Sequence, residues 1–280
     1  MLKDRFYLFF IQNKKRRFKK QKLQFIKDYL KYFKDLNFNV QIKNTTIFIG
    51  NDIDARIVFV CRYNSNRQLL NNKNKYYPLY NKHVNNDHLV RFGIIFSLGL
   101  LYFILTALFD YDFLIIIYIF LVIGVIIGKS NYHNFSSAGS LFLLQELALI
   151  ANVNNVLFVL FDEHNHSSFN LKNKAYHTII YLDNLVYGND LLLATRNIER
   201  SEIKTDILEA YTNIFYIRLS PSEFTQFDHE CKLLVLSLGF KEHDEFYCKY
   251  IDTNDDVTLN LVVYTKILIF LKQLVLCDTL

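Results

Sequence analysis

Residues 155–194 read NVLFVLFDEHNHSSFNLKNKAYHTIIYLDNLVYGNDLLLA and contain three apolar runs, at 155–161, 178–182 and 190–194. The first two runs are rich in β-branched and aromatic residues, and polar segments separate all three. Short apolar runs bounded by polar segments are typical of strands that are buried on both faces of a sheet. This stretch therefore predicts three buried strands joined by polar connections.

The same alternation continues through the rest of the chain. Further predicted strands lie at residues 55–61 and 233–238, and predicted helices lie at 23–33, 136–150 and 202–214, with a last helix opened by Asp255 and Asp256. Buried strands interleaved with helices indicate an α/β fold with a mainly parallel sheet. In such a sheet, functional sites form at the carboxyl ends of the strands. Here those ends are residues 62–66, 162–168 and Asp183.

The composition fits one main domain. The chain has 280 residues, of which 51% are hydrophobic and 21% charged, with 8 glycines and 2 prolines. This is enough apolar material for one sizeable core, and it excludes a disordered or collagen-like chain. The 4 cysteines form no CxxC pair. The sequence therefore indicates neither a disulfide framework nor a zinc knuckle, and it favours a reducing compartment.

Two uncharged apolar runs lie in the middle of the chain, at residues 92–109 and 113–128. As helices they would be about 27 and 24 Å long, close to a hydrocarbon core of about 30 Å. We expect a transmembrane hairpin with helices at about 90–109 and 111–128. A pair of buried core helices in a soluble protein is the alternative reading of the same runs.

The short turn between the two runs predicts the topology. It must return the chain to the side from which it came, so both flanks face the same compartment. Basic residues lie on these flanks, at Lys82, Arg91 and Lys129, and the only charged residues of the turn are two aspartates. By the positive-inside rule we expect a two-pass protein of the cell membrane with both termini cytoplasmic.

The hairpin divides the rest of the chain into two parts. Residues 69–86 are rich in Asn, Lys and Tyr and predict a connecting loop. We interpret residues 69–131 as one insertion, between residues 1–68, which hold an amphipathic helix and the first part of the domain, and residues 132–280, which hold its remainder.

A basic cluster precedes the first predicted helix. A solvated helix face is one interpretation. The other is attraction to anionic lipid, worth about 1 kcal/mol for each basic residue near a membrane surface. The expected partner is then the lipid bilayer and not nucleic acid, because no aromatic and basic recognition pattern accompanies the cluster. The cluster consists of Lys14, Lys15, Arg16, Arg17, Lys19, Lys20 and Lys22.

Five segments near the predicted strand ends carry a resemblance to a known family. They are CRYNS from Cys61, NFSSAGSLFLLQELA from Asn134, VLFVLFDEHN from Val156, IIYLDNLVYGNDLLLAT from Ile179 and FYCKYIDTNDD from Phe246. Taken in order, they resemble the co-catalytic zinc aminopeptidases, the family that also includes glutamate carboxypeptidase, glutaminyl cyclase and the catalytically silent transferrin receptor. The resemblance implies a zinc-exopeptidase-like three-layer sandwich with a mainly parallel mixed sheet, here interrupted by the two-helix transmembrane hairpin.

The family's chemistry needs two zinc ions, anionic or imidazole ligands and a glutamate general base. Of the site positions that the resemblance matches, Asp183 is the one that holds the same residue type as in the family. The general-base position holds His164. The ligand positions hold Arg62 in place of His, Asn134 in place of the bridging Asp, Asn165 in place of Glu, and Cys248 in place of the last His.

Since a guanidinium cannot lose its proton to bind a metal, we expect no intact catalytic site and no cofactor. We predict a membrane-anchored cytoplasmic pseudo-peptidase that binds a peptide or a membrane-protein partner. An active membrane-bound metallo-aminopeptidase with altered ligands and a structural membrane protein remain as alternatives. If the chain is active, zinc would occupy a rearranged site made by His133, His164, His166 and Asp183.

Overall fold

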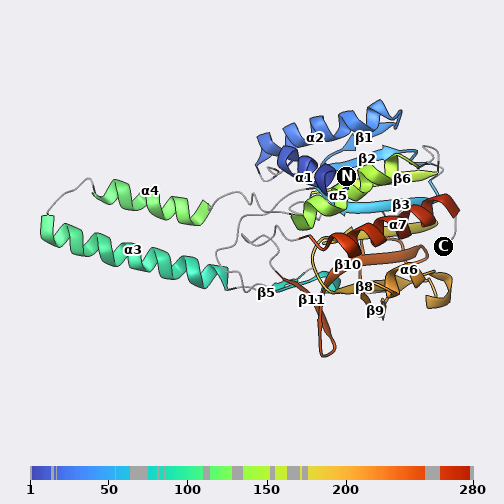
Figure 1. Ribbon diagram of the computed structural model, residues 1–280. Helices are drawn as coiled ribbons and strands as arrows, with labels where there is room; N and C mark the ends of the chain where they lie inside the picture. The colour runs from blue at the N-terminus through green and yellow to red at the C-terminus, as the bar shows by residue number, and fades with distance from the viewer. Residues whose placement is uncertain are drawn as a thin grey trace.

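In the residues that the structure describes, an eleven-stranded mixed sheet forms the centre of the protein (Figure 1). Its middle consists of four parallel strands in the order β6, β3, β7, β10. The computed structural model describes residues 2–13, 16, 18–53, 55–63, 75–80, 82–84, 86–109, 114–127, 135–151, 155–162, 171, 176–249 and 259–277.

The predicted buried strands are confirmed at the middle of this sheet. They are β3 (Ile57–Arg62), β6 (Val156–Phe161), β7 (Thr178–Asp183) and β10 (Lys232–Glu242). Antiparallel pairs extend the sheet from β6 through β2 (Thr46–Gly50) to β1 (Val40–Lys43), and from β10 to β8 (Asp190–Arg196). All residues of β3, β6 and β7 are buried, which explains why their sequences are apolar apart from the polar residues at the ends of β3 and β7.

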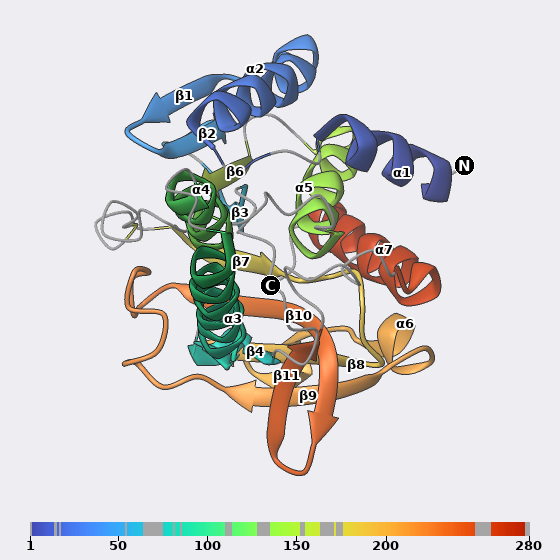
Figure 2. The same cartoon turned by 90° about the vertical axis from the view of Figure 1, so that its left-hand side faces the viewer.

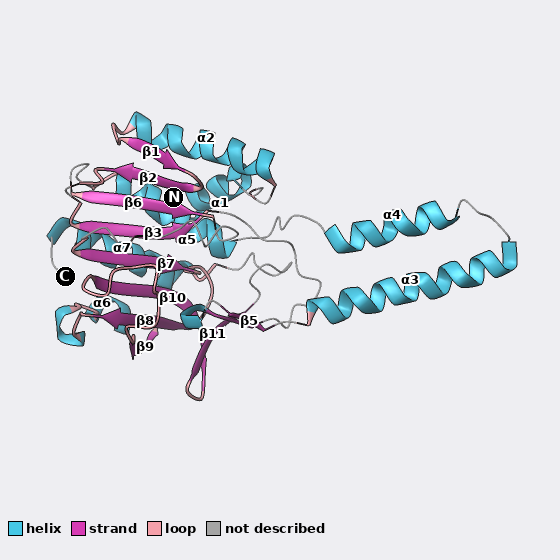
Figure 3. Cartoon of the chain, turned by 180° about the vertical axis from the view of Figure 1, so that it is seen from behind, coloured by secondary structure: helices cyan, strands magenta, loops and turns pink. Residues whose placement is uncertain are grey.

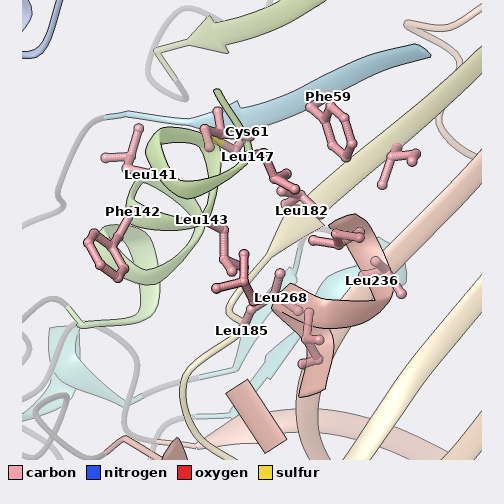
Figure 4. Packing of buried hydrophobic residues seen from close by; sticks show 14 of the residues in the cluster. Phe59, Cys61, Leu141, Phe142, Leu143, Leu147, Leu182, Leu185, Leu236 and Leu268 are labelled. Atoms are coloured by element: carbon pink, nitrogen blue, oxygen red, sulfur yellow. The ribbon is translucent and has the colours of Figure 1, made fainter. Parts of the chain in front are cut away.

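Four helices cover one face of the sheet (Figure 3). Leu147 of α5 (Phe135–Ala148) points to Cys61 of β3, and Leu143 of α5 and Leu268 of α7 (Leu261–Cys277) lie beside Leu185 (Figure 4). In the part of the chain that the structure describes, residues 219–231 and β11 (Glu245–Lys249) help to cover the opposite face. The four helices are α1 (Leu2–Asn13), α2 (Lys19–Asp35), α5 (Phe135–Ala148) and α7 (Leu261–Cys277).

The predicted helix at residues 202–214 is wrong. A 3-10 turn, Arg200–Glu202, is followed by the four-residue helix α6 (Asp206–Glu209), and Asn213–Arg218 is strand β9. The sequence NIFYIR in β9 is rich in β-branched and aromatic residues, and β8 offers a parallel partner along its length. Strand pairing therefore prevails over the helical pattern.

The predicted loop at residues 69–86 is also wrong in its second half. Strands β4 (Lys75–Tyr77) and β5 (Lys82–Val84) form an antiparallel pair joined through a 3-10 turn, Pro78–Tyr80. Strand β4 pairs with β11 (Glu245–Lys249), which itself pairs with β10. The partner strand lies far away along the sequence, so the local composition does not predict this arm. Asp255 and Asp256, expected to open the last helix, lie outside the described residues.

Helices α3 (Asp87–Phe109) and α4 (Leu114–Ile127) project from the domain as an antiparallel pair (Figures 1 and 2). Tyr102 and Tyr118 stack across the pair with ring centroids 5.2 Å apart. At the base, Arg91 Nε donates to Asp87 Oδ2 at 2.6 Å, and Arg91 Nη1 donates to the carbonyl oxygen of Val125. The arginine thus joins the start of α3 to the last turn of α4.

Helix α3 is the one helix in the described ranges that is long and apolar enough to cross a membrane, judged by length and composition. Its apolar stretch has a mean hydropathy of 2.1, and 6% of that stretch is buried. Helix α4 has 14 residues, or about 21 Å, and falls short of a span. The expected two-pass topology is therefore not supported.

Candidate functional site

Arg62 and Asp183 meet at the carboxyl edge of the parallel strands. Arg62 ends β3 and Asp183 ends β7, and these two strands pair in a register that places their last residues side by side. Both side chains are almost fully buried, at 6% and 1% exposed, and Arg62 Nε lies 3.8 Å from Asp183 Oδ1. The guanidinium carbon also lies 5.6 Å from the centre of the Tyr76 ring. The buried carboxylate therefore has a fixed internal cation beside it.

Cys248 lies in the same region but is a poor metal ligand. Its Sγ is 3.5 Å from Ser237 Oγ and donates to the carbonyl oxygen of Leu238 at 3.4 Å. Burial, together with the negative charge of Asp183, raises the pKa of the Cys248 thiol to about 12. Since the thiolate is the form that binds metals and attacks substrates, this thiol is neutral and inert near pH 7.

The acidic residue after β6 is also paired internally. Asp162 is 4% exposed and accepts a hydrogen bond from Lys22 Nζ of α2. Arg16, in the same basic cluster, is buried, and its Nη2 donates to Ser137 Oγ at 2.7 Å. Arg16 and Lys22 therefore hold α2 against the domain, and Lys19 and Lys20 are the exposed members among those that the structure describes.

The structure confirms neither the resemblance-based metal positions nor the rearranged site as a whole. It brings Arg62, Asp183 and Cys248 to one region. Several predicted residues lie outside the described ranges: His133, Asn134, His164, Asn165 and His166 of the site, and Lys14, Lys15 and Arg17 of the basic cluster.

The described residues do not fit the two-zinc centre that the resemblance implies. Arg62 adds a permanent positive charge within 4 Å of the carboxylate that would hold a metal. Among the residues with described positions, no three His, Cys, Asp or Glu side chains come together in a way that could hold a metal ion.

Sequence reasoning missed three partners at this edge. Tyr76 reaches Arg62 from β4, Ser237 reaches Cys248 from β10, and Lys22 reaches Asp162 from α2. The register of β7 with β10 pairs Asp183 with Ser237 and could have indicated the serine. No local sequence signal points to the other two.

Strand order, helix placement and the polar edge together define a zinc-exopeptidase-like α/β fold. The LapA aminopeptidase of Legionella pneumophila is similar, with a TM-score of 0.54 and 10% identity, over 99% of this chain and 71% of that chain. The glutaminyl cyclase of Porphyromonas gingivalis is similar, with a TM-score of 0.55 and 8% identity, over 96% of this chain and 97% of that chain. A Zn-dependent exopeptidase from Parabacteroides distasonis is similar, with a TM-score of 0.52 and 9% identity, over 97% of each chain.

At these identities the likeness concerns the fold. No protein-family model matches the sequence, and no curated protein matches it.

Proposed function

We propose that this chain is a membrane-anchored pseudo-peptidase, which keeps the exopeptidase-like fold, does not hydrolyse peptide bonds, and binds a peptide or a membrane-protein partner. The observation that carries the proposal is the buried Arg62–Asp183 pair at the carboxyl edge of the sheet. Zinc-dependent hydrolysis needs a metal that activates water and polarises a carbonyl. A fixed guanidinium 3.8 Å from Asp183 balances part of its negative charge and opposes the approach of a divalent cation.

The exposed apolar surface of the hairpin supports the membrane anchor. Phe103 of α3 is 73% exposed and Phe120 of α4 is 70% exposed, and none of the described residues of α4 is buried. An exposed apolar surface of this extent is unusual for a soluble protein and typical of a membrane contact. A core helix of a soluble domain would be mostly buried, which disfavours the alternative reading.

Both ends of the hairpin return to the same domain, so the domain and both termini lie on one side, which we assign to the cytoplasm by the positive-inside rule. We propose that residues 69–131 are an insertion whose helices α3 and α4 enter the bilayer together from the side of the domain, although α4 alone is too short to support a second full span. The shorter helix α4 can be accommodated by tilt of α3 and local thinning of the bilayer.

The catalytic part of the proposal is tested with the purified full chain. The metal content is measured, and a panel of aminoacyl amides and peptides with N-terminal glutamine is incubated with excess zinc, cobalt or manganese. Both reactions are included because the similar structures comprise an aminopeptidase and a glutaminyl cyclase. We expect no stoichiometric metal and no rate above the blank. A metal-dependent rate that Asp183→Ala abolishes would establish the active alternative, with zinc at His133, His164, His166 and Asp183.

The anchor is tested by extraction of membranes with alkaline carbonate. We expect the native chain to stay in the membrane pellet. Ile117→Arg on α4 should lower the membrane yield, because a central arginine costs about 2.5 to 3.5 kcal/mol on insertion scales. Ile42→Arg on β1 is the matched control, since Ile42 is 57% exposed and lies outside the hairpin. Equal membrane yields for the two variants would count against the anchor.

A further inference from the structure

The first half of α2 and the residue before it carry exposed basic and apolar side chains on one stripe, which we call the outer stripe: Phe18, Lys19, Lys20, Leu23 and Lys27. Phe18 is 45% exposed and Leu23 58%, and the three lysines are exposed. Residues 19, 23 and 27 follow each other at the spacing of one helix face. No acidic residue lies in the first turn of α2. The stripe therefore joins positive charge with accessible apolar surface.

The outer stripe lies at the same end of the domain as the base of the hairpin. The bond from Lys22 to Asp162 places the first turn of α2 beside the carboxyl end of β6. The bond from Arg16 to Ser137 places the preceding residues beside the first turn of α5. Figure 2 looks onto this end of the domain, with α3 and α4 projecting towards the viewer, α2 above them and α1 further to the right.

The basic side chains near the start of α2 divide by role. Arg16 and Lys22 point inward and hold the helix to the domain. Lys19, Lys20 and Lys27 are on the outside. Lys19 and Lys20 lie in the first turn of α2, where positive charge at the amino end of a helix is electrostatically unfavourable. An apolar side chain set among exposed lysines suits the boundary between anionic headgroups and acyl chains, where both components are stabilised.

We propose that the outer stripe docks on the headgroup layer of an anionic bilayer next to the inserted hairpin. This inference rests on the proposed membrane anchor. The contact fixes the orientation of the domain on the membrane, since the hairpin alone is joined to the domain at a single end. Lys31 and Lys34 lie further along α2, about 18 to 21 Å along the helix from Lys19 and Lys20. This distance exceeds about two Debye lengths at physiological salt, so the charges of Lys31 and Lys34 are screened from a bilayer that contacts the first turn of α2.

The sequence offers a clean reporter, because it contains no tryptophan. Leu23→Trp places one indole on the outer stripe. Ile53→Trp is the matched control, since Ile53 is 89% exposed and follows β2 at the opposite edge of the sheet. The full-length variants are reconstituted into vesicles of phosphatidylcholine alone or with phosphatidylserine. Tryptophan emission and quenching by brominated lipid are then recorded, with circular dichroism as the check on folding.

We expect the Leu23→Trp emission to shift to the blue and to be quenched in phosphatidylserine vesicles only, with no change for Ile53→Trp. Lys19→Gln with Lys20→Gln should lower the ratio of docked to undocked protein about thirtyfold, or roughly fivefold for each lysine. Lys31→Gln with Lys34→Gln removes the same charge from the same helix and should leave the ratio unchanged.

Identical Leu23→Trp spectra in both vesicles, from protein that resists carbonate extraction, would overturn the docking surface while leaving the anchor intact. Loss of the protein from the vesicles by carbonate would overturn both. An equal spectral response to an RNA oligonucleotide in phosphatidylcholine vesicles would overturn the lipid assignment in favour of a nucleic-acid partner.

Discussion

Breaking the buried Arg62–Asp183 pair should destabilise the domain strongly, and removing both charges together should destabilise it much less. At a separation of 3.8 Å and an effective dielectric constant of about 20, the Coulomb attraction is about 4 kcal/mol. Removing one partner of a buried pair leaves the other charge uncompensated, which typically costs about 3 to 5 kcal/mol. We therefore expect Arg62→Met and Asp183→Asn each to lose about 3 to 5 kcal/mol of unfolding free energy. The double variant should lose about 3 kcal/mol less unfolding free energy than the sum of the losses of the two single variants.

The assay is thermal and chemical unfolding of the full chain in detergent, followed by circular dichroism. For a chain of this size, each kcal/mol of lost unfolding free energy lowers the melting temperature by about 2 to 4 °C. The melting temperature of each single variant should therefore fall by roughly 6 to 20 °C. The exposed pair Lys75–Glu242, with an N···O distance of 3.0 Å, is the control and should show no resolvable coupling despite its shorter distance. Additivity of Arg62→Met and Asp183→Asn within about 0.5 kcal/mol would refute the internal-cation reasoning.

Three further outcomes follow from the described contacts. Gly188→Ala should lower the unfolding free energy by more than about 1 kcal/mol, measured by denaturant titration, because its φ is +147° and a Cβ would lie 2.3 Å from the Gly239 nitrogen. Arg91→Met should lower the melting temperature of the detergent-solubilised chain, because the 1% exposed Asp87 then loses its cation. Iodoacetamide at pH 8 should leave Cys248 unmodified in the folded protein, checked by peptide mass spectrometry, because folding raises its pKa from 9.0 to about 12. The stability linked to that thiol is present below about pH 9 and is lost as the pH rises towards 12.

The middle of the sheet could be predicted from the sequence because its strands are buried on both faces, as in VLFVLF of β6, and need no partner information to be recognised. The incorrect predictions concern strands that form because they pair with strands elsewhere in the sequence. Strand β4 forms because β11 offers an edge, and β9 forms because β8 does. Composition around residues 75–77 and 213–218 carries no record of those partners, so a loop and a helix were reasonable but incorrect expectations.

The candidate site divides in the same way. Arg62 lies beside Asp183 because β3 and β7 pair in one parallel register. The order of the strands in the chain does not predict this pairing, since β6 lies between β3 and β7 in the sequence. The resemblance to the zinc aminopeptidases does predict it, because it matches both residues to positions of one site. The inward direction of Arg16 and Lys22 does not follow, since a dense basic cluster normally indicates a solvated surface. Their partners, Ser137 and Asp162, are contributed by α5 and by the end of β6, more than 100 residues away.

The proposed anchor has a consequence for access to the polar edge. Strand β5 ends at Val84 and α3 begins at Asp87, so the chain can separate them by only about 10 Å. Strand β4, paired to β5, supplies the Tyr76 ring that lies over Arg62. If α3 lies in a bilayer, the Arg62–Asp183 edge is held close to the headgroups, and a large folded protein in solution cannot approach it along the strand direction. A flexible peptide, or the segment of a membrane protein next to its span, can reach the edge laterally, so a partner that uses this edge should be recovered from membranes and not from the soluble fraction.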